Sequence, residues 1–191
     1  MTTAESPLTY QQTPRPIGAP VTYRLKGDRL QVEGLRTDHD LPLSEVVHVR
    51  LTYEAGRMSG GFFRTRLRLR DGRTVTLTSL SWAGTLRSIQ QTPAYGRFVA
   101  ALLAAVRRAN PDAVMEAGKP ALQWGGMALV AVAISVAVFW LVARALAGGS
   151  TVTAAFGLML GMLMVWQIGP LLRLNRPRPI EASNPPAELL G

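Results

Sequence analysis

The sequence predicts an α+β domain joined to a membrane segment. A small antiparallel β-barrel or sheet, closed by one amphipathic helix, precedes a two-helix transmembrane hairpin. Three observations predict this fold class. Apolar and polar residues alternate in several short runs of the first 80 residues, an apolar pattern of helical period follows, and two long uncharged runs come last.

Composition excludes several protein classes before any motif is considered. The 191 residues are 48% hydrophobic, which is too apolar for a chain disordered over most of its length. Cysteine is absent, so disulfide scaffolds, cysteine metal sites and thiol nucleophiles are excluded. The net charge is +9, and residues 1–120 hold 17 of the 21 basic and 10 of the 12 acidic residues.

The first twenty residues are rich in proline, threonine and glutamine, which predicts a flexible N-terminal tail over residues 1–20. They contain no basic stretch followed by an apolar run, so we expect no signal peptide. Thr2 stands where N-myristoylation requires glycine.

Alternating residues predict strands within residues 21–34, 46–54 and 62–80. Each run offers one apolar and one polar face, as in an antiparallel sheet that covers a core. Asp71-Gly72 is a strong hairpin signal. A three-residue loop, residues 70–72, with Gly72 at positive φ keeps the apolar residues of both strands on one face.

The period then changes to that of a helix. Apolar residues recur at helical spacing from Tyr95 to Val106, which predicts an amphipathic helix over about Thr92–Ala109. Asn110-Pro111 ends it. We expect this helix to close the open end of the sheet and to bury its remaining apolar face.

This order of hairpins and closing helix resembles the pleckstrin-homology-like (PH-like) fold, in the small bacterial versions that are fused to membrane helices. The resemblance covers residues 21–110 and is one of pattern, so it transfers no site residues to this chain. It implies a binding or scaffolding module rather than an enzyme. The alternative fold is a two-layer α+β sheet with the same helix on one face.

Two apolar runs predict the membrane segment. Between Gly125 and Leu172 the only charged residue is Arg144, and each run is long enough to cross the hydrocarbon core of a bilayer. The alternative is a buried helical hairpin in a soluble core. The predicted boundaries are a linker over residues 111–123, spans over 124–146 and 152–172, an external loop over 147–151, and a basic, proline-rich tail over 173–191.

Positive charges and tryptophans predict the orientation of the hairpin. Arg107, Arg108 and Lys119 precede the first span and three arginines follow the second, whereas the connector has no basic residue. The positive-inside rule then places both termini in the cytoplasm and the protein in the inner membrane as a two-span protein. The expected interface anchors are Trp124, Trp140, Arg144, Arg173, Arg176 and Arg178.

Small residues recur at four-residue spacing within both spans, at Ala133 and Ala137 in the first and at Gly157 and Gly161 in the second. Such pairs let two helix backbones approach closely. They serve either docking onto another membrane helix or packing of the two spans on each other, and we favour the second.

Arg64, Arg66, Arg68 and Arg70 form the most distinctive polar pattern. In a strand their side chains share one face at a spacing of about 6.7 Å, and the three-residue loop places Thr74, Thr76 and Thr78 beside them. This face is either a solvated surface, a contact for anionic lipid headgroups, or a contact for an acidic protein partner. Nucleic acid is less favoured, because no aromatic residues alternate with the arginines.

Recognisable catalytic and metal-binding patterns are missing from the sequence. It has no glycine-rich phosphate loop, and His39 between Asp38 and Asp40 lacks the further ligands that zinc requires. His48 falls on the polar face of a strand, where we expect it to be exposed. An enzyme would need an unexpected pocket with Asp38, Asp40 and Glu45.

We therefore expect a protein without cofactor or metal, a non-enzymatic membrane-anchored scaffold. It would be an accessory or assembly subunit of an inner-membrane complex, or a homo-oligomer. The alternative is a membrane-surface sensor whose arginines bind anionic lipid. The Leu189-Leu190 end either docks in a groove or frays, and we favour fraying.

Overall fold

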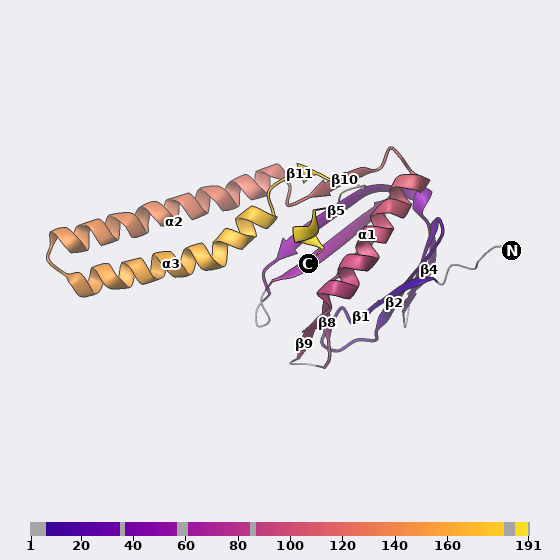
Figure 1. The fold of residues 1–191 in the computed structure, drawn as a ribbon, viewed down its shortest axis with the longest axis horizontal. Coiled ribbons are helices and arrows are strands. Elements are labelled where there is room, and N and C mark those ends of the chain that lie inside the picture. The colour runs from indigo at the N-terminus through magenta and orange to yellow at the C-terminus, as the bar shows by residue number, and fades with distance from the viewer. Residues whose placement is uncertain (1–6, 35–36, 57–60, 85–86, 182–185, 191) are drawn as a thin grey trace. The chain divides into compact units, whose positions relative to one another are not determined.

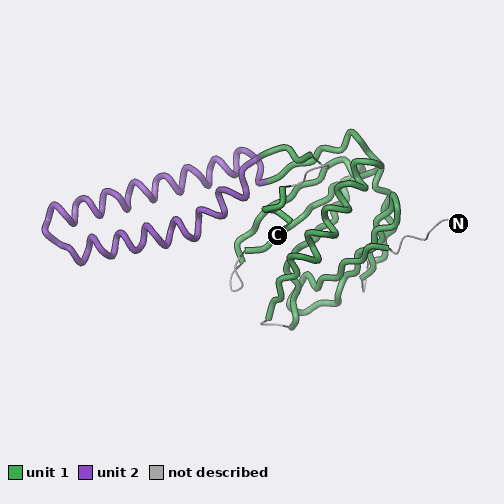
Figure 2. Tube along the Cα trace, in the orientation of Figure 1, with its two compact units in different colours: residues 1–117, 178–191 green, residues 118–177 purple. Residues whose placement is uncertain are grey.

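The computed structural model describes residues 7–34, 37–56, 61–84, 87–181 and 186–190. The chain divides into two compact units (Figure 2). The sheet unit contains residues 1–117 and 178–191, and the hairpin unit contains residues 118–177. The sheet unit is therefore built from both ends of the chain, and the hairpin unit is inserted into it.

Two sheets form most of the sheet unit. The N-terminal sheet has the order β1-β2-β3-β4, and the central sheet has the order β11-β10-β5-β6-β7. A third, two-stranded sheet pairs β8 with β9. The strands are β1 (Leu8–Gln12), β2 (Val21–Lys26), β3 (Arg29–Gly34), β4 (Thr37–Pro42), β5 (Val46–Glu54), β6 (Phe62–Leu69), β7 (Thr74–Thr78), β8 (Leu80–Trp82), β9 (Ser88–Gln90), β10 (Val114–Ala117) and β11 (Arg178–Pro179), with a short 3-10 helix, η1 (Leu43–Glu45), before β5.

The structure has the predicted mixture of helices and sheets, but two finer expectations are wrong. The described strands form open sheets and do not close into a barrel. The central sheet is also not purely antiparallel, because β10 pairs with β5 in parallel. Two parallel strands need a crossover connection. Here α1 (Thr92–Ala109), which follows β5 and precedes β10 in the chain, carries the chain back along the sheet.

The amphipathic helix occupies the predicted residues. α1 lies over one face of the sheets (Figure 1). The six apolar residues that predicted it are fully buried: Tyr95, Phe98, Val99, Leu102, Leu103 and Val106. The Tyr95 hydroxyl is 2.6 Å from Thr65 Oγ1 on β6, so the face of β6 that carries Thr65 is the face that α1 covers.

The hairpin between β6 and β7 has the predicted loop. The Leu69 amide donates a hydrogen bond to the Arg73 carbonyl at 2.9 Å, which leaves residues 70–72 as the loop. Gly72 has a φ of +85°, a conformation that glycine adopts at no steric cost. The register places Arg64 opposite Thr78, Arg66 opposite Thr76 and Arg68 opposite Thr74, as predicted.

The N-terminal segment corrects the predicted boundaries. Residues 8–12, assigned above to a flexible tail, form β1 and pair with β2. Tyr10 and Gln12 point into the structure and are buried. The alternation pattern did not predict this strand because Gln12, a polar residue, occupies a buried position. A glutamine is buried only where hydrogen bonds satisfy its amide.

The C-terminal segments also differ from the predicted linker and tail. Residues 114–117 of the linker form β10, and residues 178–179 of the tail form β11, which pairs with β10. The Ile180 amide continues this pairing by donating to the Met115 carbonyl at 2.9 Å. The chain thus leaves the sheet unit after one strand and returns on the neighbouring strand.

The end of the chain packs into the sheet unit instead of fraying. Leu189, in the short helix η2 (Ala187–Leu189), is 1% exposed. The following residue approaches α1 so closely that a Cβ added at Gly96 would lie 2.4 Å from the Leu190 carbonyl oxygen. Glycine at position 96 is what permits this contact.

The hairpin unit consists of two long helices, α2 (Ala121–Ala147) and α3 (Thr151–Leu174), joined by Gly148, Gly149 and Ser150. Both are long and apolar enough to cross a membrane. They extend beyond the predicted spans by one to three residues at each end. The connector, residues 148–150, is accordingly shorter than the external loop predicted over 147–151.

We predict that Leu189→Ala destabilises the full chain by about 2–5 kcal/mol, because it removes a buried leucine and leaves a cavity. Urea unfolding of the detergent-solubilised protein, followed by circular dichroism, measures this loss. Ile17→Ala is the matched control, since Ile17 is 83% exposed and its truncation should change little. Equal stability of the two variants would show that the C-terminal segment frays.

Candidate functional site

The polar face of the central sheet carries the predicted arginines. Arg66 and Arg68 on β6 are exposed, whereas their neighbours Leu67 and Leu69 are buried beneath α1. Arg70 lies directly after β6 and is also exposed. We call Arg64, Arg66, Arg68 and Arg70 the arginine row.

Acidic partners neutralise only part of this face. Arg64 Nη1 lies 3.3 Å from Glu54 Oε1, and its guanidinium lies 5.5 Å from the centre of the Phe62 ring. On β5, Arg50 pairs with Glu116 of β10. Arg66, Arg68 and Arg70 make no ion pair with any residue in the described part of the chain.

His48 was expected to be exposed, but it is half-buried on the same face. Its Nε2 lies 3.1 Å from Glu116 Oε2. Hydrogen bonds from Arg50 first, and from His48 second, lower the pKa of the Glu116 carboxyl below its usual value. Glu116 therefore stays ionised and holds Arg50, which stands directly opposite Arg66 in the sheet.

The free edge of β7 is covered by side chains of the N-terminal sheet rather than by another strand. Gln12 accepts from the Thr78 amide at 2.6 Å through Oε1, and its Nε2 donates to the Thr76 carbonyl at 3.3 Å. Tyr23 donates to the same Thr76 carbonyl at 3.0 Å, and Tyr10 donates to the Thr78 carbonyl at 2.6 Å. We call Tyr10, Gln12 and Tyr23 the edge cap.

The two tyrosines of the edge cap remain protonated, and so able to donate, at any ordinary pH. Burial raises the pKa of Tyr23 to about 12 and raises that of Tyr10 further. The two tyrosine rings also pack together, with centroids 6.4 Å apart, and Tyr10 contacts Phe98 of α1. The cap thus ties β7 to β1, β2 and the core.

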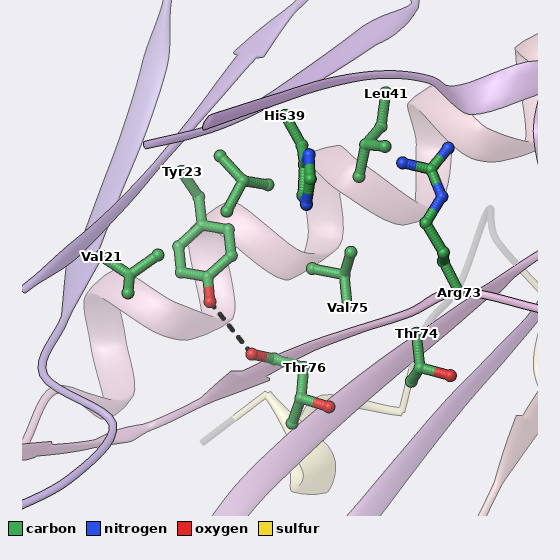
Figure 3. Close-up of a pocket in the computed structure, with 9 residues that line it drawn as sticks. Val21, Tyr23, His39, Leu41, Arg73, Thr74, Val75 and Thr76 are labelled. Carbon is green, nitrogen blue, oxygen red and sulfur yellow. Dashed lines mark hydrogen bonds between the residues drawn. The ribbon is translucent and has the colours of Figure 1, made fainter. Parts of the chain in front are cut away.

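Beside the edge cap the two sheets separate and leave a cavity of about 340 Å³, which we call the β7-edge groove (Figure 3). One wall is the inner face of the N-terminal sheet, and the other is the first half of β7. The groove is lined by Val21, Tyr23, Val32, His39, Leu41, Arg73, Thr74, Val75 and Thr76.

Sequence reasoning missed this groove, although it singled out His39 as a member of a weak cluster. His39 stands opposite Val32 in the N-terminal sheet, so its ring borders the groove. Of its two acidic neighbours, Asp40 pairs with Arg29 at 2.9 Å. Among the described residues no three histidine or acidic side chains gather to hold a metal ion.

The small residues of the hairpin unit divide into two groups. A Cβ added at Gly157 would lie 2.6 Å from Val142 Cγ2, and one added at Gly161 would lie 3.6 Å from Val138 Cγ1. Both glycines therefore face α2. Ala133 and Ala137, by contrast, are exposed. The buried positions of α2 are Ala131 and Ala145, which face α3 instead of the alanine pair that spacing alone suggested.

The expected interface anchors have different surroundings. Trp140 and Arg144 on α2 are exposed, as are Arg173 and Arg176 at the end of the hairpin unit. Trp124 donates its indole N–H to the Leu172 carbonyl at 2.9 Å, so it joins the open ends of α2 and α3.

Arg178, predicted to flank the second span, belongs to the sheet unit. It lies in β11, half-buried, with Nη2 3.8 Å from Glu188 Oε2. Its position is a consequence of the β10–β11 pairing, which no charge pattern reports.

Comparisons with protein-family models, with curated proteins and with solved structures find no match for this chain. Three features of the molecule bear on its function: the arginine row, the β7-edge groove and the apolar hairpin unit.

We predict that Gly157→Leu destabilises the hairpin unit by about 1–3 kcal/mol, because the larger side chain collides with Val142. Titration of the full chain in mixed micelles with sodium dodecyl sulfate, followed by circular dichroism, measures the change. Ala133→Leu is the control and should unfold as the wild type does. The opposite ranking would place Ala133 at the contact between the helices.

Proposed function

We propose that this protein is a non-enzymatic, membrane-anchored binding protein that serves as an accessory or assembly subunit of an inner-membrane complex. One observation carries the membrane part of the proposal. Within α2 and α3 only Ala131, Ala145, Ala154 and Gly157 are buried, while large apolar side chains such as Phe139, Met162 and Trp166 are exposed. Soluble monomers rarely expose so large an apolar surface to water, whereas the hydrocarbon core of a bilayer would cover it.

The sheet unit supports the proposed topology. Residues 117 and 178 pair with each other in one sheet, at the two ends of the inserted hairpin unit. A single folded unit cannot be divided by a bilayer, so both ends of the hairpin lie on the same side. The positive charges before and after the spans make that side the cytoplasm.

The binding part of the proposal rests on the resemblance to PH-like domains. The described elements run as β1–β4 in one sheet, β5–β7 in a second, the β8–β9 pair and then α1, without a closed barrel. The feature of the sheet unit that supports binding is a groove beside an edge of β7 that is only partly covered.

The test of the proposed function is purification from native membranes in a gentle detergent, with mass spectrometry of the intact assembly. We expect a stoichiometric companion, either a different membrane protein or a second copy of this chain. A monomer without a companion, under conditions that keep known complexes of the same membrane intact, would contradict the proposal.

A second candidate function, a membrane-surface sensor, is favoured by a specific observation. Arg66, Arg68 and Arg70 are exposed and lack an acidic partner among the described residues. Basic residues near an anionic leaflet gain about 1 kcal/mol each. A tethered domain meets that surface at high effective concentration, so three such residues suffice to hold it there.

We predict that a fluorophore on Thr52→Cys, on the same sheet face as the arginine row, responds to phosphatidylglycerol. Its emission should shift to the blue in nanodiscs that contain phosphatidylglycerol but not in phosphatidylcholine alone. Arg66→Glu/Arg68→Glu should abolish the shift, because the repulsive charges face the lipid. Arg87→Glu/Arg97→Glu is the control with the same change in net charge, at exposed positions outside the row. A shift that survives in the first variant removes the sensor function.

A further inference from the structure

The first half of β7 presents backbone groups that no part of the sheet uses. The Leu69 amide bonds to the Arg73 carbonyl, and the Ser79 amide bonds to the Phe63 carbonyl. The backbone amides and carbonyls of the odd-numbered residues of β7 therefore point toward β6. The amides and carbonyls of the even-numbered residues, Thr74, Thr76 and Thr78, point away from β6 toward the edge.

The edge cap satisfies only the second half of this edge. Gln12, Tyr10 and Tyr23 bond to both backbone groups of Thr78 and to the Thr76 carbonyl. In the described part of the chain nothing bonds to the Thr76 amide or to either backbone group of Thr74. An unpaired edge of this kind is a template for another strand.

The β7-edge groove lies beside these unused groups. Figure 3 shows Thr74 and Thr76 on one side of it and Tyr23, His39 and Leu41 on the other. The far wall is apolar at Val21, Val32 and Leu41. A strand added along β7 would direct every second side chain into this space, and about 340 Å³ accommodates one or two aliphatic side chains.

The charges around the groove favour an incoming segment of one kind of charge. Arg68 stands directly opposite Thr74, and Arg73 borders the groove, where it bonds to Asp71 in the turn. Arg66 stands opposite Thr76. The lining contains no acidic side chain. An incoming segment with acidic residues on the side of the arginines is thus attracted, and a basic one is repelled.

We propose that the β7-edge groove binds an extended acidic segment of a partner protein, which adds to β7 as a strand at Thr74–Thr76 and inserts an aliphatic side chain between the sheets. The proposal rests on the proposed binding function and specifies the partner segment by its chemistry. The backbone bonds supply affinity, the groove selects an aliphatic residue, and the arginines select acidic neighbours.

Proline at position 74 gives a sharp test. Thr74 is the first residue of β7, a position that tolerates proline, and its amide takes no part in the ladder with β6. Thr74→Pro therefore removes a groove-facing donor while leaving the β6–β7 pairing intact. Thr74→Val keeps the amide and the shape of the side chain, so it is the matched control.

The probe is a fluorescent seven-residue peptide of alternating aspartate and valine, titrated by anisotropy onto the full chain in detergent. A peptide of alternating lysine and valine is its counterpart. We expect the acidic peptide to bind wild type and Thr74→Val equally and Thr74→Pro at least about tenfold more weakly. We expect the lysine peptide not to bind.

Hydrogen exchange of the wild type provides a second measurement that needs no variant. The acidic peptide should slow exchange at the Thr74 and Thr76 amides and leave Thr78, already bonded to Gln12, unchanged. Failure of the acidic peptide to bind, equal binding of both peptides, equal binding to Thr74→Pro and Thr74→Val, or unchanged exchange at Thr74 would each overturn the proposal.

The outcomes also separate this inference from the proposed function. A Thr74→Pro protein that still purifies with its companion leaves the accessory-subunit function in place and removes the groove as the contact. Loss of the companion in Thr74→Pro, but not in Thr74→Val, together with binding of the acidic peptide, supports both. A wild type without any companion contradicts the proposed function alone, since the peptide titration still decides the chemistry of the groove.

Discussion

The pairing of β10 with β11 is the constraint on which the rest of the structure depends. These short strands lie at the two ends of the hairpin unit, and β10 is in turn paired with β5 at the centre of the sheet. The pairing makes the first and last parts of the chain one folded unit. It places Ile180 and Leu189 in the core, and it requires the residues before and after the hairpin to share one side of any bilayer that the hairpin crosses.

The same unit shows how an open pair of sheets can protect a strand edge without closing into a barrel. A buried glutamine and two buried tyrosines replace the missing strand along half of β7. Their burial is stable because each polar atom meets a backbone partner. Protection of half an edge leaves the remainder free, and this division creates the groove beside Thr74. Within the described residues, these three side chains cover the edge at Thr78 and at the Thr76 carbonyl and leave the backbone groups of Thr74 uncovered.

The arginines of the central sheet are likewise of two kinds, those with an acidic partner and those without one among the described residues. Cross-strand neighbours Arg50 and Arg66 would repel each other, and Glu116 relieves this by holding Arg50. Glu54 does the same for Arg64. The basic side chains near the turn are left exposed. Arg66, Arg68 and Arg70 thus present positive charge near the turn between β6 and β7 that no acidic side chain of the described residues pairs with.

Elements whose sequence signals come from residues close together in the chain were predictable. The β6–β7 hairpin with its three-residue loop, the burial of one face of α1 and the two apolar helices all follow from local periodicity and from glycine at a turn, since each signal lies within one or two adjacent elements. Distant contacts were not predictable. Gln12 is buried because its amide meets Thr76 and Thr78, more than sixty positions away.

The amino-acid sequence by itself determined which segments are strands of alternating polarity, which residues of α1 form the core, and which two segments are apolar enough for a membrane. Only the tertiary structure decided that β1 and β10 exist, that the C-terminal residues return to the core, that Gly157 rather than Ala133 lies between the helices, and that a groove opens beside β7. The physical reason is that periodicity records the solvent exposure of each element along the chain. The partner that satisfies a buried amide or fills a space between sheets comes from elsewhere in the sequence and leaves no local pattern.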